Sequence, residues 1–213
     1  MKPAYWDDAT RALARSDRVL QRLMRKYPGI HLKRRGDPFT TLARAIVSQQ
    51  ISVAAAAAIW KRFLTVSGAA PVRGFPRLPA ASVAALAPAV LRACGLSQRK
   101  AEYLADLAGH FASGRLDPRG WRKLDDEALI AALVDVKGIG RWTAEMFLIF
   151  HELRPDVLPI DDLGLQRAMA IHYRNGRPFT RRAMVAHAES WRPWRSVATW
   201  YLWRSLDPIP VEY

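Results

Sequence analysis

Apolar residues recur at helical intervals along nearly the whole chain, and this periodicity is the feature that most constrains its fold. In the segment 8–26, for example, Leu13 and Leu20 stand two helical turns apart. Capping residues mark where segments begin, as at Asp37-Pro38, where an N-cap residue precedes proline at the first helical position. No alternation of polar and apolar residues long enough for a useful strand interrupts the pattern. The sequence therefore predicts an all-α protein with short connections.

About ten helices are expected, and the Ser52 side chain is predicted to cap the one that carries the alanine run. A stretch rich in glycine and proline, 67–79, reads as a linker or long loop. The predicted helical segments are 8–26, 38–48, 53–66, 80–87, 88–93, 97–114, 125–135, 141–152, 162–173, 180–191 and 194–206.

Basic residues greatly outnumber acidic ones, and this excess narrows the class of partner. The chain has 33 Lys+Arg against 19 Asp+Glu, a formal net charge of +14. Such a balance suits nucleic acid first and an anionic membrane second. Residues 163–204 contain eight arginines and a single acid, Glu189. A charge run is ordinarily a solvated face, but one this unbalanced repels itself without a counter-charged partner. No segment there has the isolated apolar face that a membrane surface would need.

The single cysteine and the N-terminal segment exclude other classes. With Cys94 alone, the chain has no intramolecular disulfide framework, cysteine-based zinc site or four-cysteine iron–sulfur cluster. Residues 1–22 carry charges throughout and lack the apolar core of a secretory signal. No apolar run reaches the roughly 18 residues that span a membrane. We therefore expect a cytoplasmic protein.

A glycine-punctuated turn at 136–140 lies between two predicted helices and can hold a phosphate. Gly138 and Gly140 permit positive φ angles and leave no Cβ where a phosphate approaches. A helix begins directly after them, so its N–H groups and the positive end of its dipole face that phosphate. Ile139 is expected to anchor the turn in the core, and Lys137 can add a charge. A plain tight turn between helices explains the same pattern equally well.

Two adjacent acids, Asp161 and Asp162, stand at the next junction between a loop and a helix. Aspartate is a favoured N-cap, and acids stabilise helix N-termini by roughly 0.3–1 kcal/mol, so one of the two explains the helix start. The second is free for chemistry. We assign Asp161 to capping and Asp162 to a cleft, where its charge meets an electropositive sugar or a water molecule.

Five ordered stretches together resemble the helix-hairpin-helix DNA glycosylase superfamily, most closely its alkylated-base branch, 3-methyladenine DNA glycosylase II. The stretches are ARAIVSQQISVAAAAAIWKRF (43–63), GLSQRKAEYLADLA (95–108), VKGIGRWTAEMFLIF (136–150), LPIDDLGLQRA (158–168) and ESWRPWRSVATWYLWRSLDP (189–208). They follow the family's order and cover most of the chain. The resemblance implies base-excision repair of damaged double-stranded DNA by base flipping.

The family's catalytic aspartate is the second of its tandem pair, which is Asp162 here. In that family a carboxylate stabilises an oxocarbenium-like sugar and can activate the attacking water. Members that also cleave the strand carry a Schiff-base lysine two residues after the hairpin's second glycine, where this chain has Trp142. The resemblance therefore implies a monofunctional glycosylase that leaves an abasic site.

Trp142 and Trp203 match positions that line the family's base pocket. Alkylated purines such as 3-methyladenine and 7-methylguanine carry positive charge, and an indole face attracts a flipped cation by stacking. Most of the chain's eight tryptophans are nevertheless expected in the core. Met146 replaces a tyrosine of the best-known branch, which alters one pocket wall and leaves hypoxanthine or an oxidised base open as the lesion.

The remaining family positions contact DNA. The wedge that fills the gap left by the flipped base aligns with Gln50, beside Gln49, although an exposed loop glutamine explains these residues equally well. Backbone contacts are expected from Gly138, Gly140, Thr143 and Lys137. The resemblance also allows a monovalent cation, Na⁺ or K⁺, on hairpin carbonyls near Val136 and Ile139; no other metal or cofactor is expected.

The resemblance also predicts the architecture: two helical subdomains with the active site in the cleft between them, in one catalytic unit over 1–213. A central subdomain of approximately 45–160 would end in the hairpin, with 1–44 and 161–213 forming the other. About 36 residues precede Asp37-Pro38, which predicts a compact form without the family's N-terminal β domain. We expect a monomer. A non-catalytic helix-hairpin-helix DNA-binding module is the alternative from another class, against which the acidic pair and the pocket tryptophans count.

Overall fold

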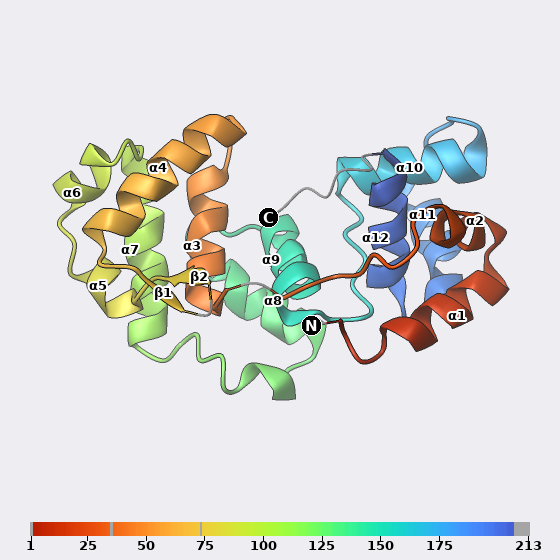
Figure 1. The fold of residues 1–213 in the computed structure, drawn as a ribbon, viewed down its shortest axis with the longest axis horizontal. Helices are drawn as coiled ribbons and strands as arrows, with labels where there is room; N and C mark the ends of the chain where they lie inside the picture. The colour runs from red at the N-terminus through yellow and green to blue at the C-terminus, as the bar shows by residue number, and fades with distance from the viewer. Residues whose placement is uncertain (1, 35, 73, 207–213) are drawn as a thin grey trace. The chain divides into compact units, whose positions relative to one another are not determined.

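The computed structural model describes residues 2–34, 36–72 and 74–206, in which the regular secondary structure is helical apart from one small two-stranded ribbon (Figure 1). The all-α prediction is confirmed. The chain divides into two compact units, one formed by 35–147 and the other by 1–34 together with 148–213. The boundaries expected near 45 and 160 lie inside these units. The first observed boundary lies before α3 (Pro38–Ser48), because this helix packs on α4 and α7. The second lies before residue 148, because the Val157 amide and the Pro155 carbonyl both bond to Ser196 of the other unit.

The unit 35–147 is built around α7 (Gln98–Ala112), which packs against α3, α5 and α6. The predicted caps of α3 and α4 are confirmed, because Asp37 accepts from the Thr40 amide and Ser52 from the Ala55 amide. The other helices of this unit are α4 (Val53–Val66), α5 (Ala80–Ala84), α6 (Pro88–Ala93), α8 (Asp126–Val134) and α9 (Arg141–Phe147), with a 3₁₀ turn at Trp121–Lys123.

The expectation of a linker or long loop at 67–79 is wrong over part of its length. Strands β1 (Ala70–Val72) and β2 (Phe75–Arg77) pair antiparallel, with Ala70 opposite Arg77. Each strand has only three residues, too few for a polar–apolar alternation to be recognised. The Leu78 amide donates to the Thr40 hydroxyl at 2.8 Å, which fastens the end of the ribbon to α3.

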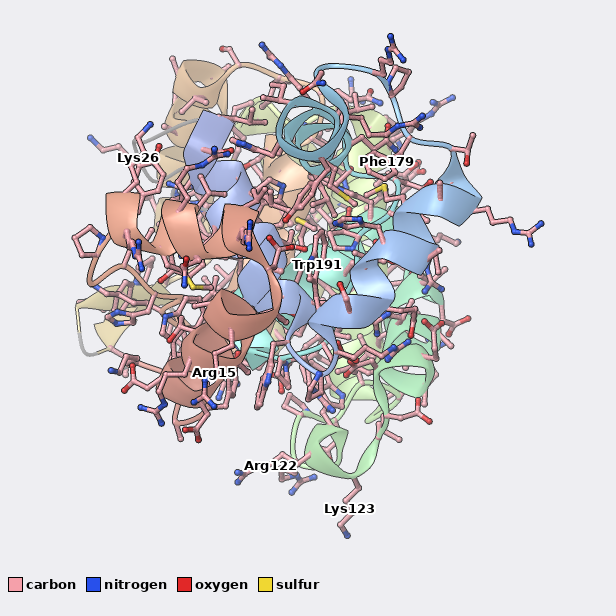
Figure 2. The ribbon with its side chains drawn as sticks, turned by 90° about the vertical axis from the view of Figure 1, so that its right-hand side faces the viewer. Arg15, Lys26, Arg122, Lys123, Phe179 and Trp191 are labelled. Atoms are coloured by element: carbon pink, nitrogen blue, oxygen red, sulfur yellow. The ribbon has the colours of Figure 1, made fainter. Side chains whose placement is uncertain are left out.

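In the other unit, α1 (Trp6–Ser16) and α2 (Arg18–Lys26) replace the single helix expected over 8–26. The break is at Asp17, whose Oδ1 accepts from two amides of α2 and whose Oδ2 accepts from the Tyr173 hydroxyl and the Trp191 indole N–H. Figure 2 shows Trp191 between the N-terminal helices (red) and the C-terminal helices (blue). One carboxylate therefore starts a helix and joins the N-terminal helices to the C-terminal part of this unit.

The C-terminal part of this unit contains three helices, α10 (Leu163–Arg174), α11 (Arg181–Ala188) and α12 (Arg195–Leu206). Of these, α12 is buried along most of its length. A π-helical segment, Leu148–Glu152, leads into the unit, and a 3₁₀ turn, Glu189–Trp191, follows α11. α12 packs on α1, α2 and α10. Within the described residues, no helix has both the length and the apolar character needed to cross a membrane.

Candidate functional site

The predicted hairpin is present, with its turn between the end of α8 and the start of α9. Gly138 has φ +83°, and a Cβ built there would stand 2.2 Å from Cδ2 of Tyr103, so a side chain has no room. Ile139 is buried as predicted. Gly140 differs from the prediction: its φ is not in the left-handed region, and an added Cβ would meet no atom within 4 Å. Glycine at 140 leaves the outer face of the turn open.

Further contacts fix the hairpin from both sides. The backbone amide of Lys137 donates to the Asp106 carboxylate of α7 at 2.9 Å, and the lysine side chain is exposed. Arg141 binds both carboxylate oxygens of Glu127 in α8, and its Nε donates to the buried Glu145 at 2.9 Å. The hydrogen bonds that Arg141 donates to Glu127 are the largest cause of the raised pKa of Arg141. Arg141, which the sequence did not single out, thus clamps the two hairpin helices together.

Gln49 and Gln50, the residues predicted to enter DNA, have different surroundings. The Gln49 side chain donates to the Gly138 carbonyl at 2.9 Å and is half-buried. Gln50 is exposed and has φ +55°, the left-handed conformation that non-glycine residues rarely adopt. The side-chain amide of Gln49 is therefore already bonded within the protein. Only Gln50 presents its side chain to solvent.

Asp162 is the N-cap of α10, so the assignment of capping to Asp161 is wrong. Oδ1 of Asp162 accepts from the Leu165 amide at 2.6 Å and from the Trp203 indole N–H at 2.8 Å. The Asp161 carboxylate is instead exposed and pairs with Arg181 of α11. Both acids are good N-caps, and the indole of α12 distinguishes them. The residue expected to perform chemistry is therefore also the one that starts the helix.

An aromatic wall adjoins the Asp162 carboxylate. The Trp203 ring stacks on Phe150, with centroids 5.6 Å apart and an angle of 12° between the planes. A Cβ at Gly164 would lie 3.1 Å from Asp162 Oδ1 and 3.3 Å from Trp203 Cδ1, so glycine permits this approach. Phe150 was not predicted as a site residue. It belongs to the π-helical segment, and such segments often mark functional sites.

The other predicted pocket residues belong to α9, in the unit 35–147. Trp142 is 41% exposed, an uncommon state for a tryptophan in a folded chain, whereas Met146 is 8% exposed and lies one turn further along the helix. Thr143 between them is half-buried. The carbonyl of Val136 accepts the Ile139 amide at 3.1 Å and keeps a second lone pair for a cation, which stays a prediction.

Half of the arginines between residues 163 and 204 are already neutralised or buried within the unit. Arg181 pairs with Asp161, while Arg192 and Arg195 both bind Asp156 at 2.7 Å. The buried Arg204 guanidinium lies 4.5 Å from the Trp200 ring centroid. The expected self-repulsion was overestimated, because the compensating acids stand just before this stretch. The exposed arginines that remain for a partner are Arg167, Arg174, Arg177 and Arg182.

Comparisons with known proteins show the family to which the chain belongs. The profile of the HhH-GPD superfamily base excision DNA repair proteins matches residues 43–194. DNA-3-methyladenine glycosylase 1 of Schizosaccharomyces pombe is 35% identical, over 87% of this chain and 80% of its own length. The DNA-3-methyladenine glycosylase of Bacillus subtilis is 31% identical over 91% of this chain, which spans 65% of that relative.

Two solved structures share the fold. A DNA-3-methyladenine glycosidase from Bacillus halodurans has a TM-score of 0.83 and 33% identity, over 92% of this chain and 87% of that one. A 3-methyladenine DNA glycosylase from Schizosaccharomyces pombe, solved in complex with abasic DNA, has a TM-score of 0.77 and 33% identity, over 93% and 96%. The family profile covers more than half of the chain and the fold is shared with these relatives: the chain belongs to the HhH-GPD superfamily of base excision DNA repair proteins.

Proposed function

We propose that the protein is a monofunctional DNA glycosylase that removes alkylated, cationic purines, such as 3-methyladenine and 7-methylguanine, from double-stranded DNA. It hydrolyses the N-glycosidic bond of a flipped nucleotide and leaves an abasic site. The observation that carries the proposal is the Asp162 carboxylate fixed beside the Trp203–Phe150 stack. The names of the relatives, which are 3-methyladenine glycosylases, support the same class of substrate. We further propose that it works as a monomer in the cytoplasm.

Asp162 supplies the negative charge that the reaction needs. Departure of the base leaves an oxocarbenium-like sugar, and a carboxylate close to C1′ stabilises its positive charge. The same group can accept a proton from the attacking water. Bonds from the Leu165 amide and the Trp203 indole hold Oδ1 in one place. The carboxylate is therefore oriented before DNA binds, and the activation free energy does not include an entropy loss for ordering it.

The indole faces recognise the cationic base. An alkylated purine attracts an electron-rich indole by cation–π contact, and its charge also weakens the bond to the sugar. Trp142 is exposed and Trp203 is half-buried, so neither residue is closed off from solvent. Recognition by aromatic faces suits several cationic lesions, because it selects charge and shape and not one hydrogen-bond pattern.

Replacing Trp142 with alanine should lower single-turnover excision of 7-methylguanine by about ten- to a hundredfold, because stacking on an aromatic ring contributes roughly 1–3 kcal/mol per base. Trp142→Phe should keep part of the rate. The matched control is Phe75→Ala, which removes another exposed aromatic side chain from the same unit and should leave the rate unchanged. Equal rates for Trp142→Ala and the wild type would remove Trp142 from the base pocket.

The absence of lysine at position 142 predicts base release without strand cleavage. A lyase needs an amine that attacks C1′ and forms a Schiff base, and an indole nitrogen cannot do this. Incubation with lesion-containing duplex should give abasic sites that break only after heat or added base. Borohydride should trap no covalent protein–DNA adduct. Spontaneous strand cleavage by the pure protein would contradict the monofunctional mechanism.

The deciding experiment measures base release from duplexes that each carry one defined lesion. Release of 3-methyladenine and 7-methylguanine, with little or none of hypoxanthine or 8-oxoguanine, supports the proposal. The opposite ranking would support the alternative, a glycosylase for a neutral lesion, which the replacement of the family's tyrosine by Met146 keeps open. Binding without any release would point to a non-catalytic DNA-binding module.

A further inference from the structure

One face of α7 carries four side chains that reach out of the helix to neighbouring segments. Lys100, Tyr103, Asp106 and His110 are spaced three, three and four residues apart, so they lie along one side of the helix. Lys100 contacts the loop after α3, Tyr103 underlies Gly138, Asp106 binds the Lys137 amide, and His110 binds Asp135 at the end of α8. A single helix face thus supports both the loop and the hairpin.

Lys100 is the contact of this face that reaches the loop. Its Nζ donates to the carbonyls of Val47 and Gln49, each at 2.7 Å. These carbonyls stand at the C-terminal end of α3, where backbone acceptors lack partners within the helix and a cation is favoured. The ammonium is half-buried, and this desolvation lowers the pKa of Lys100. Two of its three N–H donors are therefore directed into the protein and not toward a ligand.

Gln49 joins the loop after α3 to the hairpin. The backbone of Gln49 accepts from Lys100, while its side chain donates to the Gly138 carbonyl at 2.9 Å. Gly138 in turn rests on the Tyr103 ring. Gln50 follows directly in the left-handed conformation, which persists in a non-glycine residue when its surroundings fix it.

We propose that Lys100 is a positioning residue for base flipping, which fixes Gln50 relative to the hairpin through Gln49. In this role the hairpin binds the phosphate backbone while Gln50 fills the gap left by the extruded base. The distance between Gln50 and the hairpin must therefore stay fixed. The inference rests on the proposed function, because it assigns the support of that wedge. It also changes the role expected of Gln49, from a residue that enters DNA to one that connects the loop after α3, which carries Gln50, to the hairpin.

Lys100→Met tests the proposal, because methionine keeps most of the length and loses every donor. The readout is binding to a duplex with a stable abasic analogue opposite 2-aminopurine, whose fluorescence rises when it is unstacked. We expect at least about tenfold weaker binding and a smaller rise in fluorescence, because the loop loses both charge-assisted hydrogen bonds and one such bond alone contributes about this factor or more. Lys100→Arg, which keeps the donors, should restore most of both signals. The matched control is Lys61→Met, which removes an exposed lysine from α4.

Two measurements separate positioning from a direct phosphate contact. A lysine that binds phosphate adds about one to the slope of log affinity against log salt concentration. Lys100→Met should keep the wild-type slope, and a slope reduced by about one would overturn the proposal. Excision should also fall more for a paired lesion than for one opposite a mismatch, because an unpaired base is easier to extrude. An equal loss on both substrates would likewise count against positioning.

Gln49→Met provides a second route to the same link. If Lys100 acts through Gln49, the double variant should be no weaker than the weaker single variant, because residues in one network are not additive. Fully additive effects would overturn the proposed connection. The binding readouts need no excision. A wild type that binds abasic DNA but excises nothing contradicts the proposed function alone, and a Lys100→Met variant equal to an active wild type contradicts the positioning role alone.

Discussion

Asp162→Asn is expected to reduce base excision on the order of a hundred- to a thousandfold, the usual loss when one group that stabilises the transition state is removed. Asparagine keeps an oxygen at Oδ1, so it can still accept from the Leu165 amide and the Trp203 indole. Asparagine and aspartate are also similar as N-caps. The substitution therefore removes the charge and preserves the fold, which separates the two roles of this residue.

Single-turnover excision of 7-methylguanine, measured with thermal unfolding and binding to abasic DNA, checks this result. The matched control is Asp161→Asn, which breaks the exposed pair with Arg181 and should change the rate and the stability little, because exposed pairs contribute about 0–1 kcal/mol. Asp162→Asn with wild-type activity would show that the residue only caps α10. A large loss in the Asp161 variant would move the catalytic role to that residue.

Gly138→Ala should lower the free energy of unfolding by about 2–5 kcal/mol, since a left-handed φ costs roughly 1–2 kcal/mol and an overpacked side chain roughly 1–3. The new Cβ would stand 2.2 Å from the Tyr103 ring, and a ring atom cannot move away without disturbing α7. The hairpin should shift, and affinity for abasic DNA should fall with it. Urea unfolding and equilibrium DNA binding give the two quantities.

Gly140→Ala is the matched control, because it adds the same methyl group two residues later. Its φ is ordinary and no atom lies within 4 Å of the added Cβ, so stability should change by about 1 kcal/mol or less. A loss of DNA affinity in this stable variant would indicate that the phosphate approaches at Gly140. If both variants unfold at the same urea concentration, the Tyr103 contact does not restrict position 138.

Features set by neighbouring residues could be predicted from the sequence. The caps at Asp37 and Ser52, the buried Ile139 and the helix–turn–helix order of the hairpin each depend on residues within a few positions. Local chemistry also suggested two good N-caps at 161 and 162. It could not rank them, because the deciding indole, Trp203, comes 41 residues later.

Features set by distant partners could not be predicted. The break between α1 and α2 is fixed by Asp17, whose partners Tyr173 and Trp191 lie 156 and 174 residues further along the chain. Gln49 bonds to a carbonyl 89 residues away, so its sequence neighbours gave no sign of that role. The excess of arginine looked more unbalanced than it is because Asp156 and Asp161 lie just outside the counted stretch.

The bonds of Asp17 to Tyr173 and Trp191 also have a consequence for biosynthesis. The helices α1 and α2 are synthesised before residues 35–147, whereas α12, on which both helices pack, and the Asp17 partners Tyr173 and Trp191 are synthesised after them. Residues 35–147 form a continuous stretch that can fold while the rest is still being made. The apolar faces of α1 and α2, including Leu13 and Leu20, stay uncovered until α12 has been synthesised. Translation thus orders the assembly: the unit with the hairpin can form first, and the unit with Asp162 can form only after α12 has been synthesised.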